Sequence, residues 1–136
     1  GTNDAYTKHF NAEDYEIHYD LLLYRIKEIA PNAALLLTVP NDSYLYRRYV
    51  NKNTEEVRRV IYKLAEKHGC AVWDFYSIMG GLNSVSTWYR AGLTARDKIH
   101  FNRRGYHLQA DLLFNAFMRS FDYYLERKSK QEKISN

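Results

Sequence analysis

The spacing of apolar residues divides the chain into segments of helical and extended character. Between Ala12 and Ala30 the apolar side chains recur every three or four positions and share one face, which predicts an amphipathic helix. Pro31 ends this helix, because its ring cannot be accommodated within the hydrogen-bond ladder. Ala33–Val39 is apolar on both faces, and such runs are typical of parallel strands that lie between two layers of helices.

The same order of elements repeats further along the chain. Asn53 and Glu56 match a capping box at the start of a second helix, and Gly69 is placed to end it. Cys70–Phe75 is predicted as a short strand, and a connection of about 25 residues without clear periodicity follows, a length that usually indicates a functional or disordered loop. The last helix is expected to begin near 103–106. Four of its side chains are expected to be buried: Leu113, Phe117, Phe121 and Tyr124.

Helices that alternate with strands in this way predict an α/β fold with a parallel sheet. Two parallel strands do not make a stable sheet alone, because three or more are normally needed. We therefore expect the pattern to be incomplete on its N-terminal side. An exposed strand edge invites pairing with another chain, so the expected partner is the N-terminal part of the same protein or a second copy.

Composition and charge narrow the classes of protein that need to be considered. With 46% apolar and 26% charged residues, the chain has the composition of an ordinary globular domain, and no apolar run is long enough to predict a membrane span. The last ten residues hold four lysines or arginines against one glutamate and so account for +3 of the net charge of +4. We expect 1–126 to be the C-terminal part of one domain, 127–136 to be a frayed basic tail, and no nucleic-acid partner.

The segment Gly1–Asp4, Gly-Thr-Asn-Asp, is the first candidate for chemistry. A glycine permits close approach of the backbone, and the Asn3 side chain offers an amide that can donate a hydrogen bond. The alternative is a turn at the start of a helix in which Asn3 or Asp4 serves as the cap.

The second candidate is Asp97–His100, which stands just before the last predicted helix. Ester hydrolysis by a serine needs an imidazole to accept the hydroxyl proton and a carboxylate to hold the imidazole in the correct tautomer. An aspartate and a histidine three residues apart on a turn can face one site. The alternative is that His100 is a solvated residue at the start of the helix and Asn102 is its cap.

Taken together, Gly-x-Asn-Asp and Asp-x-x-His-Phe-Asn-x-x-Gly-Tyr resemble the third and fifth sequence blocks of the SGNH (GDSL-type) hydrolase superfamily. The stretch Met79–Leu93 resembles the corresponding loop of bacterial members. The resemblance implies a flavodoxin-like, three-layer α/β/α parallel sheet, present here only in its C-terminal part. It also implies a serine ester hydrolase that acts on small acyl esters, with carbohydrate O-acetyl groups expected first, and that needs no metal ion or organic cofactor. Bacterial relatives are often exported, which favours a periplasmic or extracellular location.

The resemblance assigns a role to each matched residue. Asn3 would donate its amide to the oxyanion of the tetrahedral intermediate, and Gly1 would permit the turn that presents Asn3. His100 would act as general base and then as general acid, while Asp97 would orient its imidazole. The family's nucleophile lies in a Gly-Asp-Ser block that does not occur in this sequence, so we expect this chain to be catalytically incomplete by itself.

Three aromatic residues are further candidates for substrate binding. Tyr44 and Tyr46, next to Arg47 and Arg48, follow the first predicted strand, where ligands bind in sheets of this kind, although such a stretch can also be a half-buried loop. Trp88 is expected either to cover the site or to pack in the core. The rival interpretation of the whole chain is a non-enzymatic α/β interaction module in which the Gly-Thr-Asn-Asp and Asp-Lys-Ile-His segments are only helix caps.

Overall fold

A parallel two-stranded sheet lies at the centre of the structure, a computed structural model that describes residues 1–134. Strand β1 (Leu36–Val39) pairs with β4 (Ala71–Asp74) in a register that places Leu36 opposite Ala71 and Val39 opposite Asp74. The α/β fold with parallel strands is therefore confirmed, although each strand is shorter than the sequence pattern predicts.

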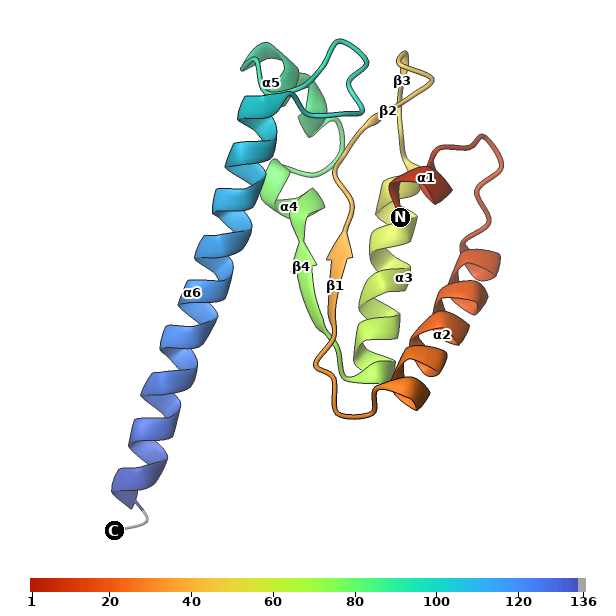
Figure 1. Ribbon diagram of the computed structural model, residues 1–136. Helices are drawn as coiled ribbons and strands as arrows, with labels where there is room; N and C mark the ends of the chain where they lie inside the picture. The colour runs from red at the N-terminus through yellow and green to blue at the C-terminus, as the bar shows by residue number, and fades with distance from the viewer. Residues whose placement is uncertain (135–136) are drawn as a thin grey trace.

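Two helices cover one face of this sheet (Figure 1). They are α2 (Ala12–Ile29) and α3 (Asn53–His68), and their apolar faces pack with Leu37 and Val39 of β1. This core consists of branched aliphatic side chains that are almost completely buried, and such burial is the main favourable contribution to folding. The first layer and the middle layer of the flavodoxin-like arrangement are thus in place.

The opposite face is covered by α6 (Arg103–Ile134) only near the end of the strands where β4 stops (Figure 1). There an aromatic cluster, Trp73, Phe75, Trp88 and Phe101, packs against Leu112, Leu113 and Ala116 of the helix. Further along, α6 moves away from the sheet. The structure is therefore a partial three-layer α/β/α fold whose third layer is only partly supported by this chain.

The burial expected for α6 is wrong for three of its four residues. Leu113 is partly buried, but Phe117, Phe121 and Tyr124 are between 53% and 57% exposed. The predicted helical period is correct, but these side chains are exposed because no strand of the described chain lies beneath the part of α6 that follows Ala116. The basic segment that begins at Arg127 belongs to α6 as far as Ile134, and the last two residues lie outside the described part of the chain.

The N-terminal segment forms a separate short helix, α1 (Thr2–Ala5), and not the first turn of α2. Asn11 is the residue that caps α2, because its side-chain oxygen accepts hydrogen bonds from the backbone N–H groups of Glu13 and Asp14. The alternative in which Asn3 or Asp4 caps the long helix is thereby corrected.

The capping box predicted at the start of α3 is also absent. The helix includes Asn53 as its first residue, and Glu56 pairs with Arg59 instead. The Asn53 amide donates to the carbonyl oxygens of Ala5 and Thr7, at 3.0 and 2.7 Å, because these half-buried carbonyls need donors. Gly69, by contrast, ends the helix in the left-handed conformation, as predicted.

The long connection after β4 contains two short helices that the periodicity did not predict. They are α4 (Phe75–Met79), capped by the Asp74 carboxylate, and α5 (Ser84–Arg90). A further pair of short strands, β2 (Tyr44–Leu45) and β3 (Tyr49–Val50), forms an antiparallel hairpin after β1. Elements of two to seven residues are too short to show a hydrophobic period. No described helix has the length and apolar character that crossing a bilayer requires.

Candidate active site

Both candidate segments lie at the carboxyl end of β1 and contact the same stretch, Pro40–Tyr44 (Figure 1). Gly1 approaches Pro40 so closely that a Cβ added to it would lie 3.3 Å from the proline Cγ. From the other side, the Asn41 amide donates to the carbonyl of Ile99 at 3.1 Å, and the Tyr44 N–H donates to the carbonyl of Lys98 at 2.9 Å. The sheet thus brings together two segments that are almost 100 positions apart in the sequence.

Asp97 and His100 form a hydrogen-bonded pair. The imidazole Nδ1 lies 2.8 Å from Asp97 Oδ2, while Oδ1 accepts hydrogen bonds from the backbone N–H groups of Ile99 and His100. Lys98 adopts a positive φ of 54°, in the left-handed region, and this bends the segment so that the aspartate and the histidine ring meet. The turn therefore holds the carboxylate on one nitrogen of the imidazole.

The remaining nitrogen of the imidazole is free to act on a ligand. The His100 side chain is 68% exposed, and no described residue hydrogen-bonds Nε2. In an aspartate–histidine pair that serves a serine, the carboxylate holds Nδ1 and Nε2 exchanges the proton. The geometry matches this division of roles, although no serine hydroxyl in the described chain hydrogen-bonds the ring.

The carboxyl of Asp97 is adapted to remain ionised. Partial burial alone would raise its pKa, but the hydrogen bonds from the His100 ring and from the two backbone N–H groups outweigh burial and hold the pKa below its usual value. At neutral pH the group is therefore a carboxylate, which can accept a hydrogen bond from Nδ1 and stabilise a positively charged imidazole.

Asn3 lies on the exposed surface of α1 at the same end of the sheet. Its backbone carbonyl accepts a hydrogen bond from the N–H of Tyr6. Its side-chain amide forms no hydrogen bond with any residue among 1–134. The amide is thus available to donate to a ligand, as an oxyanion-hole donor must be.

Asn102 and Gly105 hold the Asp97–His100 turn against the start of α6. Asn102 caps the helix by accepting a hydrogen bond from the Gly105 N–H, and its own amide donates to the carbonyl of Gly92 at 2.9 Å. A Cβ on Gly105 would lie only 2.0 Å from the carbonyl oxygen of Leu93. Asn102 therefore does cap the helix, and this cap coexists with the Asp97–His100 pair.

Asp42 fixes the position of α5 over the end of the sheet, and the sequence analysis did not single it out. Its side chain is buried, and Oδ2 accepts a hydrogen bond from the N–H of Val85 at 2.9 Å. Burial raises the pKa of this carboxyl, because the charged form is poorly solvated there. The available signal was a polar residue three positions after a buried strand, which by itself is typical of a turn.

The three aromatic candidates occupy different environments. Tyr44 is partly buried, and its hydroxyl hydrogen-bonds Ser86 at 2.8 Å; Tyr46 is exposed at the tip of the hairpin. Trp88 is only 8% exposed and donates its indole N–H to the carbonyl of Met79, within the aromatic core. This arrangement supports the packing alternative for Trp88.

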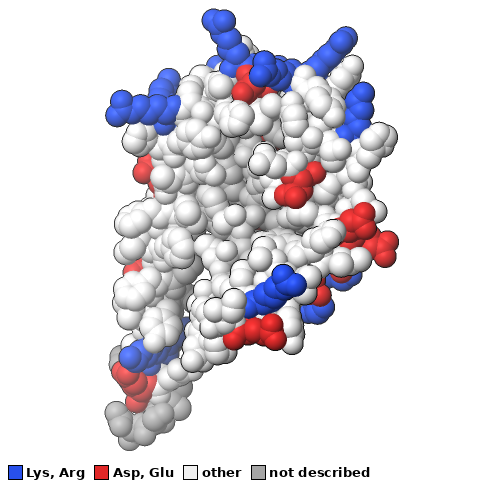
Figure 2. Space-filling model, turned by 45° about the vertical axis from the view of Figure 1, so that its right-hand side comes forward, with Lys and Arg blue, Asp and Glu red and all other residues white. Residues whose placement is uncertain are grey.

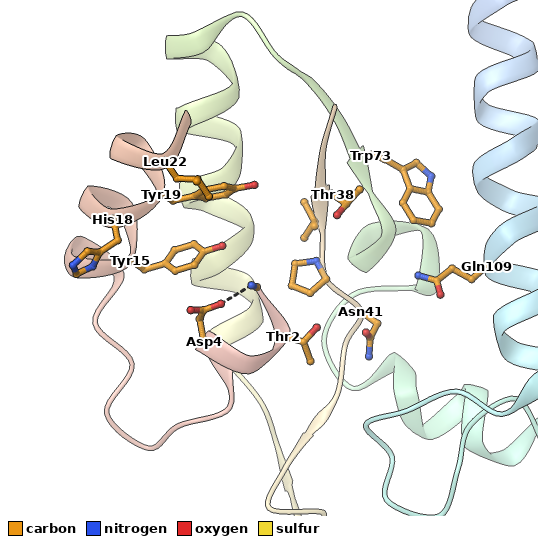
Figure 3. A pocket seen from close by; sticks show the side chains of 13 residues that line it. Thr2, Asp4, Tyr15, His18, Tyr19, Leu22, Thr38, Asn41, Trp73 and Gln109 are labelled. Carbon is orange, nitrogen blue, oxygen red and sulfur yellow. Dashed lines mark hydrogen bonds and ion pairs between the residues drawn. The ribbon is translucent and has the colours of Figure 1, made fainter. Parts of the chain in front are cut away.

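A cavity of about 660 Å³ runs beside β1 on the side where the strand has no neighbour among the described residues (Figure 3). It is lined by Tyr15 and Tyr19 of α2, Thr38 of β1 and Gln109 of α6, together with Gly1. Burial raises the pKa of the Tyr15 hydroxyl, so its phenol stays neutral. Neither Asn3 nor His100 lines this cavity, so it is a space next to the sheet and distinct from the Asp97–His100 pair.

The comparisons with known proteins identify the family. The model of the GDSL-like lipase/acylhydrolase family matches residues 1–108. Among solved structures, a peptidoglycan O-acetylesterase superposes with a TM-score of 0.81 and 24% sequence identity over 88% of this chain, and at that identity the likeness shows the fold. The chain spans 35% of the length of that enzyme. None of the curated proteins matches the sequence. The chain belongs to the GDSL-like lipase/acylhydrolase family.

Proposed function

We propose that this chain is the C-terminal catalytic part of a serine ester hydrolase that removes small acyl groups, with O-acetyl groups of carbohydrates as the first substrate. The observation that carries the proposal is the Asp97–His100 pair, whose Nε2 is exposed at the carboxyl end of the sheet. The fold shared with a peptidoglycan O-acetylesterase supports a carbohydrate ester as substrate.

In this proposal His100 Nε2 accepts the proton of a serine hydroxyl while the serine oxygen attacks the ester carbonyl. The Asn3 amide donates to the oxyanion that forms, and the protonated imidazole then delivers its proton to the leaving alcohol. Water attacks the acyl-enzyme in the same way and releases the carboxylic acid. The Asp97 carboxylate stabilises the imidazolium throughout these steps.

We propose that the serine comes from a segment outside this chain, either the N-terminal part of the same enzyme or a second copy. The unpaired edge of β1 and the cavity beside it offer space for such a segment. A strand added there would end next to Gly1 and Pro40, close to the proposed site.

The proposal is tested on the intact enzyme, with the nucleophile segment present. A fluorophosphonate probe should label one serine, and His100→Ala should abolish labelling and lower kcat for p-nitrophenyl acetate by about 10³-fold or more, because the hydroxyl loses its base. His107→Ala, which removes an exposed histidine one turn into α6, is the matched control and should leave both readouts unchanged.

The rival, a non-enzymatic module in which both segments act as helix caps, makes the opposite prediction. The Asn102 cap is the observation in its favour. Absence of probe labelling in the intact protein, or a kcat in the His100 variant within about tenfold of the wild type, would favour the module and overturn the catalytic assignment.

A further inference from the structure

The loops at the carboxyl end of the sheet carry an excess of positive charge. Segment 43–52 contains three lysines or arginines and no acidic residue, and segment 75–104 contains five against the single Asp97. Figure 2 shows lysine and arginine side chains gathered along the upper edge of the molecule, with an acidic group among them. We call the following residues the basic rim: Lys8, Arg47, Arg48, Arg96 and Lys98.

The basic rim differs from the neighbouring surfaces of α2 and α3 in how its cations are paired. On α2 and α3, lysines pair with acids, as Lys63 does with Glu16 and Lys67 with Asp20. No residue of the basic rim forms an ion pair with any acidic residue of the described chain. The rim therefore keeps its full charge toward solvent and attracts anions.

Tyrosine rings contact three of the rim cations, Lys98, Lys8 and Arg48, without neutralising them. The Lys98 ammonium lies 4.4 Å from the centroid of the Tyr44 ring and 5.2 Å from that of Tyr89. Lys8 lies 5.7 Å from the centroid of the Tyr46 ring. Such cation–π contacts fix a long side chain at the surface while its charge remains available.

Further tyrosine rings lie beside the charges. The Tyr46 and Tyr6 rings lie 5.4 Å apart, and Arg48 lies 5.5 Å from the Tyr49 ring. A tyrosine offers both an apolar face and a hydroxyl, which suits a ligand that has apolar ring faces and many hydroxyl groups.

The rim flanks the proposed site on two sides. Lys98 lies two positions before His100, and its carbonyl accepts the hydrogen bond from the Tyr44 N–H. Lys8 and Tyr6 follow Asn3 on the segment that leaves α1. A polymer held by these groups would lie along the two segments that carry Asn3 and His100.

We infer that the basic rim binds a substrate polymer that is itself anionic, an O-acylated glycan bearing carboxylate groups. The inference rests on the proposed ester hydrolase and adds the charge of its substrate. A glycan is favoured because the cations and tyrosines surround a proposed ester-hydrolysing pair; a nucleic acid, which basic patches also bind, is an outcome that the test separates.

The test compares two polymers acetylated to the same degree, polygalacturonate and neutral dextran, on the intact enzyme. The KM for acetyl groups on polygalacturonate should be about fivefold lower at low salt, and this advantage should disappear as NaCl is raised from about 0.05 M to about 0.5 M. Equal KM values at low salt would overturn the inference. Loss of activity on both polymers and on p-nitrophenyl acetate would instead show that the ester hydrolase proposal itself is wrong.

A variant that removes charge tests whether the lower KM for polygalacturonate depends on the basic rim. Arg47→Gln/Arg48→Gln should reduce the KM advantage of polygalacturonate over dextran about fivefold, since each exposed ionic contact contributes modestly. Arg25→Gln/Arg119→Gln removes the same charge from exposed positions on α2 and α6 and should leave that advantage unchanged. An equal effect of both variants, or tighter binding of a single-stranded RNA than of polygalacturonate, would contradict the inference.

Discussion

A single carboxylate, Asp97, joins the backbone of a turn to the ring that the proposed chemistry uses. One oxygen accepts hydrogen bonds from two backbone N–H groups, and the other is hydrogen-bonded to the His100 ring. The carboxylate therefore shapes the turn and also orients the imidazole. This pair could be predicted from sequence because its members are three residues apart and need only a turn to meet. The approach of Gly1 to Pro40 could not, since it depends on how the segments pack at the end of the sheet.

Replacing Asp97 with asparagine separates these two roles. The amide oxygen can still accept the backbone N–H groups, but its NH₂ group faces Nδ1 and favours the wrong tautomer of the ring. We expect kcat for p-nitrophenyl acetate to fall about 10³- to 10⁴-fold in the intact enzyme, with a melting temperature within a few degrees of the wild type. Steady-state kinetics and calorimetry measure both, and a kcat loss smaller than tenfold would contradict the role assigned to Asp97.

At the scale of elements, the long periodic segments could be predicted and the short ones could not. The helices α2, α3 and α6 each contain several turns with an apolar face, and Gly69 ends α3 where expected. The short helices α4 and α5 and the hairpin of β2 and β3 are too short to show a period, and a contact distant in sequence positions α5. The Asp42 carboxylate, 43 positions away from Val85, makes this contact.

At the start of α6, the need for Gly105 could likewise not be predicted from the sequence, because it arises from a contact across a loop. Its position after Asn102 suggests only a helix interior, where alanine is normally the better residue. The carbonyl of Leu93, however, occupies the space that a Cβ would need. The glycine allows the helix to lie against the segment that precedes the Asp97–His100 turn.

We therefore expect Gly105→Ala to destabilise the protein by about 2 kcal/mol or more, although the same change in an open helix would be stabilising. The displaced turn should also lower kcat, because His100 moves with it. Chemical denaturation and esterase assays of the intact enzyme measure these effects. Ala110→Gly, at an exposed position of the same helix, is the control for helix propensity, and a Gly105 variant more stable than the wild type would refute the steric argument.

At the scale of the whole molecule, the two faces of the sheet are unequally covered. Leu37 and Val39 are buried beneath α2 and α3, whereas Leu36 on the other face is 37% exposed. The outer half of α6 likewise exposes a set of large apolar side chains. These are Phe114, Phe117, Met118, Phe121, Tyr124 and Leu125. Exposed apolar area of this extent is typical of surfaces that are covered by another polypeptide.

The 136-residue chain, when it is isolated, exposes apolar surface that should drive association. Because β1 has an unpaired edge among the described residues and α6 exposes its apolar half, we expect the chain to self-associate and not to melt as a cooperative monomer. Size-exclusion chromatography with light scattering should give a mass above 16.2 kDa, and the dye ANS should bind.

Adding a segment that supplies the missing strand should restore a single 1:1 species with a sharp transition. Phe117→Lys/Phe121→Lys in the isolated chain should reduce association, while the same change in the intact enzyme should destabilise it, because there the two rings would be buried. A monomeric, cooperatively melting wild-type chain would show that two strands and this set of helices suffice, and that the apolar half of α6 needs no further cover.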